Sequence, residues 1–118
     1  LACLADPLPD VRQSGIKALA RRGLEEEENR ELLSRALEDE DYRVRSLAAL
    51  ALAARGGEKS QEVLLRALEQ EEKGYVFACI CRALEKVTGK QVFLLGGETD
   101  RPEARERIRR EWQEKLAP

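Results

Sequence analysis

The chain has 118 residues, the length of one ordinary domain, and its net charge of −2 provides no basic field for holding nucleic acid. Hydrophobic residues make up 42% of the chain and charged residues 37%, which excludes a disordered polymer and indicates an elongated fold with much surface. Aromatic residues account for only 4% and no apolar run is long enough to span a bilayer, so we expect packed helices rich in alanine and leucine.

The first residues, Leu1-Ala2-Cys3-Leu4-Ala5, read like the end of a helix whose beginning is missing. We therefore expect a fragment of a longer array, with an apolar N-terminal face that is open to self-association. No secretory signal pattern is visible at this end. Three cysteines, Cys3, Cys79 and Cys81, form an odd set without secretory cues, which indicates reduced thiols in a cytoplasmic protein.

Three segments of the chain repeat one pattern. The first runs from Val11 to Gly23 and the second from Val44 to Gly56, so that both ends shift by 33 residues (11 to 44 and 23 to 56); the third runs from Phe77 to Gly89. A fixed period of this size marks an array of helical hairpins, in which each unit buries its apolar face on a neighbour.

The predicted units follow one another in chain order. Residues 1–6 would end a preceding repeat, residues 7–40 would form one repeat and residues 41–72 the next. The acidic run Glu25–Glu28 would open the second helix of the first repeat, where it meets the positive end of the helix dipole. The second helices carry apolar stripes at helical spacing, made of Leu32, Leu33, Ala36 and Leu37 in one repeat and of Val63, Leu64, Ala67 and Leu68 in the other.

The last units depart from the repeat. Residues 73–89 would form the first helix of a terminal repeat, although the apolar run Tyr75–Ile80 alone is also typical of a buried strand. Residues 90–99 would be extended, with Val92–Leu95 laid on the stack in preference to offering an edge to a partner strand. Residues 100–117 would form a capping helix that begins in a capping box of Asp100 and Glu103. Its apolar stripe consists of Ala104, Ile108, Trp112 and Leu116.

The motifs Asp6-Pro7-Leu8-Pro9-Asp10-Val11-Arg12 and Asp39-Glu40-Asp41-Tyr42-Arg43-Val44-Arg45 resemble those of HEAT repeats, in particular the short bacterial kind also found in phycobilisome lyase subunits. The resemblance implies an all-α, right-handed α-solenoid of HEAT-like helical hairpins with a C-terminal capping helix. It also implies a ladder between units, which joins aspartates before the turns to arginines that open the first helices: Asp6, Arg12, Asp39 and Arg45. The ladder would stop at Ala78, which takes the place of the third arginine.

The chain contains no histidine, which removes the usual general base and a common metal ligand. We therefore expect a noncatalytic protein without cofactor or metal, a cytoplasmic protein–protein interaction scaffold or adaptor within a larger protein. Its partner would be a protein, not a nucleic acid or a membrane. In this family the second helices usually line the concave face, which implies a contact surface made of Arg30, Ser34, Arg35, Gln61, Glu62 and Arg66.

Family likeness leaves three alternatives open. The first is a subunit of a bilin lyase or chaperone, and the second is a nucleic-acid-binding protein of the kind represented by HEAT-fold DNA glycosylases. The isoelectric point of about 5.4 and the single tryptophan argue against the second. The third is the sensor end of a multidomain NTPase or defence protein.

Overall fold

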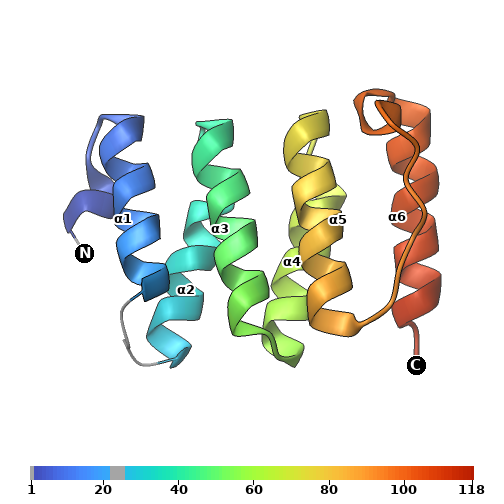
Figure 1. Cartoon of the computed structure of the whole chain (residues 1–118), viewed down its shortest axis with the longest axis horizontal. Coiled ribbons are helices and arrows are strands. Elements are labelled where there is room, and N and C mark those ends of the chain that lie inside the picture. The colour runs from blue at the N-terminus through green and yellow to red at the C-terminus, as the bar shows by residue number, and fades with distance from the viewer. Residues whose placement is uncertain (1, 22–25) are drawn as a thin grey trace.

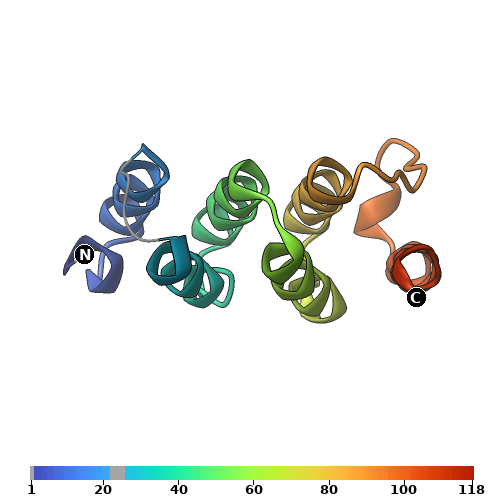
Figure 2. The ribbon, with the colours of Figure 1, turned by 90° about the horizontal axis from the view of Figure 1, so that it is seen from below.

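The computed structural model of the chain describes residues 2–21 and 26–118 as a row of helices (Figure 1). Seen from below, the helices lie in two layers, with α1, α3 and α5 in one and α2, α4 and α6 in the other (Figure 2). The row measures 38 × 28 × 18 Å and contains no strand in the described residues, so it has the predicted architecture of an α-solenoid. In order, the elements are η1 (Ala2–Ala5), α1 (Pro9–Arg21), α2 (Glu26–Ala36), α3 (Tyr42–Arg55), α4 (Glu58–Gln70), α5 (Gly74–Thr88), η2 (Glu98–Asp100) and α6 (Pro102–Leu116).

Local signals in the sequence set the ends of α3 and α5. Asp41 caps the start of α3, because its carboxylate accepts a hydrogen bond of 2.8 Å from the backbone N–H of Arg43. Gly56 ends α3 with a φ of +72°, and Gly89 ends α5 with a φ of +73°, a region that glycine enters without the steric cost other residues meet. Gly23, the predicted end of α1, lies outside the described residues.

The core follows the repeat. Leu19, Leu52 and Leu84 occupy equivalent positions on α1, α3 and α5, and all three are fully buried. In the second layer Leu33 of α2 and Leu64 of α4 correspond in the same way and are also fully buried. Each hairpin thus covers the apolar face of the next, which is why the period of the sequence and the period of the core agree.

The apolar run Tyr75–Ile80 is helical, as the repeat register predicts. Phe77 and Ile80 face the core from α5, together with Cys81 and Leu84. The helix starts at Gly74, where an added Cβ would lie 2.0 Å from the Oδ1 atom of Asp100. Glycine at this position therefore allows η2 to approach the start of α5.

Residues 90–95 form neither a helix nor a strand, and we call them the strap. In the strap Val92 is buried and Leu94 is half-buried, whereas Phe93 and Leu95 are exposed. The strap crosses the row to the edge at which α5 began, the upper edge in Figure 1, so that α6 runs in the same direction as α5. The two partners in each of the preceding hairpins run in opposite directions.

The predicted capping box at the start of α6 is wrong. The N-cap residue is Arg101, which makes no side-chain capping bond, and Asp100 belongs to η2 instead. The reason is tertiary, since the Asp100 carboxylate is placed against Gly74 and Pro102 occupies the first turn of α6. The predicted apolar stripe does face inward, with Ala104, Ile108 and Trp112 buried and Leu116 half-buried.

The direction of α6 places Arg109 at the C-terminal end of α4. Its Nε atom donates to the carbonyl of Leu68 at 2.8 Å, and its Nη2 atom donates to the carbonyl of Glu71 at 2.7 Å. Its guanidinium carbon lies 5.2 Å from the ring centroid of Phe77. A side chain from the last helix thus satisfies the open carbonyls of α4.

Candidate protein-interaction surface

Arginine side chains link the turns at the starts of the repeats. Arg12 on α1 binds both carboxylate oxygens of Asp39, with distances of 2.8 Å from Nε and 3.0 Å from Nη2. Its Nη1 atom donates to the backbone carbonyls of Asp6 and Pro7. Arg12 therefore holds its own turn through the backbone and the next turn through a bidentate ion pair. The hydrogen bonds to Asp39, partly offset by desolvation, raise the pKa of Arg12 above its usual value.

The next link repeats this geometry. Arg45 binds both carboxylate oxygens of Glu71, at 2.9 Å from Nε and 3.1 Å from Nη2. Its Nη1 atom donates to the carbonyls of Asp39 and Glu40. The six-residue separation in the sequence thus corresponds to an arginine–carbonyl contact, and the carboxylate comes from the following repeat. Nothing in the aspartate pattern points to Glu71, because a glutamate replaces the expected aspartate there.

The position equivalent to these arginines on α5 is Ala78, but α6 supplies a similar contact. Arg105 donates to the carbonyl of Thr99, six residues before it, at 2.9 Å. It also lies 3.3 Å from the Glu72 carboxylate. Arg105 on α6 therefore binds the backbone of the turn before its own helix, as Arg12 and Arg45 do, but it makes no bidentate ion pair.

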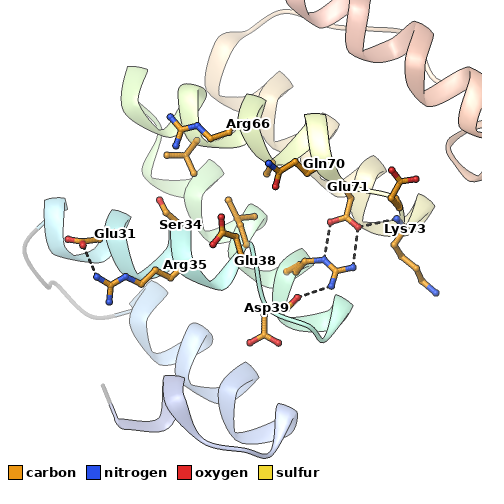
Figure 3. Close-up of a pocket in the computed structure, with 14 residues that line it drawn as sticks. Glu31, Ser34, Arg35, Glu38, Asp39, Arg66, Gln70, Glu71 and Lys73 are labelled. Atoms are coloured by element: carbon orange, nitrogen blue, oxygen red, sulfur yellow. Dashed lines mark hydrogen bonds and ion pairs between the residues drawn. The ribbon is translucent and has the colours of Figure 1, made fainter.

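A groove of about 810 Å³ lies between α2 and α4, each of which packs on α3 (Figure 3). Its apolar lining comes from Leu37, Val63 and Ala67. Its polar lining carries both signs of charge and consists of Glu31, Ser34, Arg35, Glu38, Asp39, Arg45, Arg66, Gln70, Glu71, Glu72 and Lys73. The groove thus combines an apolar surface with a mixed polar rim, as protein-binding surfaces do.

The polar groups of the groove differ in their availability. Asp39, Arg45 and Glu71 are held in the links described above. Arg35 pairs with Glu31 at 2.8 Å, but both side chains are exposed, so water screens this pair and a partner can replace it. Arg66 and Gln70, both exposed on α4, have no side-chain hydrogen bond or ion pair within the described part of the chain. These last two have free bonding capacity for a partner.

Only some of the predicted contact residues line the groove. Ser34, Arg35 and Arg66 line the groove. Gln61 is half-buried and Glu62 is exposed, and both lie on α4 outside the groove lining.

The prediction that Arg30 points outward is wrong, since only 9% of this residue is exposed. Its Nη1 atom pairs with Glu27 at 2.9 Å, and Glu27 also pairs with Lys59 of α4 at 3.2 Å. Arg30 is therefore a mostly buried residue that pairs with Glu27.

Glu38 and Gln70 were not predicted to be groove residues. Glu38 follows Ser34 by four positions and Gln70 follows Arg66 by four positions, a spacing that brings side chains to the same side of a helix.

The two cysteines on α5 are protected from solvent. Burial raises the pKa of the Cys81 thiol to about 12 and also raises that of Cys79. Cys3 is partly exposed.

We expect N-ethylmaleimide at mildly alkaline pH to modify Cys3 first in the native protein. The thiolate is the reactive form of cysteine, and the reagent must reach the sulfur atom for the reaction to occur. Peptide mass spectrometry of a time course checks this order, and equal rates for Cys3 and Cys81 would contradict it.

In the described ranges 2–21 and 26–118, no group of three or more His, Cys, Asp or Glu side chains is placed to hold a metal ion. No helix in those ranges has both the length and the apolar character needed to cross a membrane.

Two layers of stacked helical hairpins, linked turn to turn by arginines, define a helical-repeat protein of the α-solenoid class. The family model for HEAT repeats matches residues 1–85, and the chain belongs to this family. HEAT repeats generally mediate protein–protein interactions. Neither the curated proteins nor the solved structures gave a significant match.

Proposed function

We propose that this chain is a noncatalytic protein-interaction module that holds a segment of a partner protein in the groove between α2 and α4. The observation that carries the proposal is the combination, in one groove, of an apolar lining with unpaired polar groups on Arg66 and Gln70. A volume of about 810 Å³ accommodates several side chains of a partner segment.

The groove also has a rigid end. Glu71 is only 7% exposed and is fixed by Arg45, and the backbone around it is held by Arg109 of α6. A partner segment that contacts this end meets a preorganised surface, which lowers the entropy cost of binding. The opposite signs of Glu38 and Arg66 favour a partner segment that itself carries both signs of charge.

The proposal is tested by selecting short peptides from a random displayed library on the wild-type protein and measuring their affinities by fluorescence anisotropy. We expect Arg66→Glu to weaken binding of groove-directed peptides by about tenfold, because it replaces one ion pair by a repulsion. Arg110→Glu is the matched control, since Arg110 is an exposed arginine on α6 that does not line the groove. Peptides that bind both variants and the wild type equally would contradict the groove assignment.

A further inference from the structure

A second, smaller pocket of about 360 Å³ lies in the other layer of the solenoid, formed by α1, α3 and the start of α5. We call it the tyrosine pocket. Its principal residues are Lys17, Tyr42, Arg43, Leu47, Lys73 and Tyr75, with Gln13 and Ser46 beside them. Within the described part of the chain no carboxylate lines it, although the chain as a whole has a net charge of −2.

Two tyrosines shape this pocket. The rings of Tyr42 and Tyr75 meet edge to face, with centroids 6.2 Å apart and planes at 88°. Both side chains remain well exposed, at 40% and 57% of the residue surface. Exposed tyrosines that fix each other provide contact area with little further loss of side-chain entropy on binding.

The cations of the pocket are not equally available. Arg43 is paired with Asp41 at 3.0 Å and lies 3.7 Å from Asp10, so its charge is largely compensated. The ammonium of Lys73 lies 4.6 Å from the ring centroid of Tyr42. This contact orients the ammonium without neutralising it. Lys17 is exposed and has no ion pair among the described residues.

The surrounding layer is also basic. The sequences of α1, α3 and α5 together contain eight Lys or Arg residues and two acidic residues, whereas α2, α4 and α6 together contain nine and eleven. Two of the eight, Arg12 and Arg45, are held in the links between turns. The two layers of the solenoid therefore differ in the sign of their charge, which attracts acidic partners to the layer that contains the tyrosine pocket.

We propose that the tyrosine pocket is a second docking site, which binds an acidic segment of a partner protein. A carboxylate of the segment sits between the ammonium groups of Lys17 and Lys73, and a neighbouring apolar side chain packs on Tyr75 and Leu47. Lys73 also lines one end of the groove between α2 and α4, whereas Lys17, Leu47 and both tyrosines line the tyrosine pocket alone. The proposal does not depend on what the groove binds.

The geometry favours an acidic protein segment over nucleic acid. Base stacking requires an open aromatic face, but Lys73 already covers one face of Tyr42 and the second tyrosine stands perpendicular to it. The pocket has room for one or two side chains and offers only two uncompensated cations, too few for a phosphate backbone.

The test is a selection of random displayed peptides on the full chain carrying Arg66→Glu, which weakens the groove and leaves the tyrosine pocket intact. We expect the enriched peptides to contain aspartate or glutamate next to a leucine or an aromatic residue. We expect Lys17→Glu, which changes a residue outside the groove, to weaken their binding. We expect the double variant Lys17→Glu/Lys73→Glu to bind them at least about tenfold more weakly in fluorescence anisotropy, since two ion pairs become repulsions. Lys86→Glu, an exposed lysine of the same layer outside the pocket, should leave the affinity unchanged within about twofold.

Four results would overturn the proposal: no enrichment, enrichment of peptides without acidic residues, equal binding by the double variant, or equal weakening by Lys86→Glu. Displacement of the peptide by a single-stranded oligonucleotide of equal or higher affinity would favour nucleic acid as the ligand instead. Lys17 and Lys73 are exposed, so circular dichroism of the double variant should match that of the wild type and separate lost binding from lost folding.

Discussion

Replacing Trp112 by alanine is expected to lower the free energy of unfolding by about 3–5 kcal/mol, the range found when a large aromatic side chain is removed from a core. Trp112 is fully buried, and its indole lies against the Cys81 thiol on α5. It belongs to α6, which packs on α4 and η2. Its removal leaves a cavity that the polar contacts of Arg105 and Arg109 do not fill.

Urea denaturation followed by far-ultraviolet circular dichroism measures this effect, since the chain has no second tryptophan to serve as a fluorescent probe. We expect Trp112→Phe to lose much less stability, because it keeps an aromatic ring in the site. A smaller m-value for Trp112→Ala would indicate that α6 and the strap have already left the stack before the main transition. A loss below about 1 kcal/mol with an unchanged m-value would contradict the role of Trp112 as the anchor of the cap.

Replacing Glu71 by alanine is expected to lower the free energy of unfolding by about 2–4 kcal/mol. This is somewhat less than for a fully buried ion pair, because the Arg45 side chain is 19% exposed. The Glu71 carboxylate receives the bidentate pair from Arg45 and a hydrogen bond of 3.0 Å from the backbone N–H of Lys73. Its loss leaves a mostly buried guanidinium without a counter-charge and frees the turn between α4 and α5.

Glu72→Ala is the matched control, since its carboxylate is 80% exposed and has one contact of 3.3 Å to Arg105. We expect it to cost less than Glu71→Ala, because Arg105 loses a single contact and keeps its hydrogen bond to the Thr99 carbonyl, although its side chain is only 6% exposed. A double-mutant cycle between Arg45 and Glu71, measured by urea denaturation, should give a coupling energy of about 1–3 kcal/mol. Equal losses for Glu71→Ala and Glu72→Ala, or zero coupling, would show that the bidentate pair does not hold the repeats together.

The links between turns could be predicted from the sequence only in part. The period placed Arg12 and Arg45 in equivalent positions, and the structure gives them equivalent contacts. The period of the sequence did not predict that Glu71 would complete the second link, because a glutamate stands there instead of the expected aspartate. Arg105 was missed for a different reason, since it lies on a helix outside the repeat.

The surfaces were less predictable than the core. The resemblance to HEAT repeats placed Ser34, Arg35 and Arg66 on a contact surface of the second helices, and these residues do line the groove. The same resemblance placed Arg30 there, but only 9% of this residue is exposed. The tyrosine pocket had no signal in the sequence, because Lys17, Tyr42 and Tyr75 come from three different helices.

The helical repeat, its period and the apolar positions of each hairpin could be predicted from the sequence alone. These features depend on contacts between residues close in the chain and on a stacking rule that is the same for every unit. Four other features became visible only in the three-dimensional structure: the course of the strap, the direction of α6, the burial of Arg30 and the position of Asp100 against Gly74. Each of these depends on which distant surfaces meet at the ends and edges of the stack, where the repeat no longer specifies the neighbour.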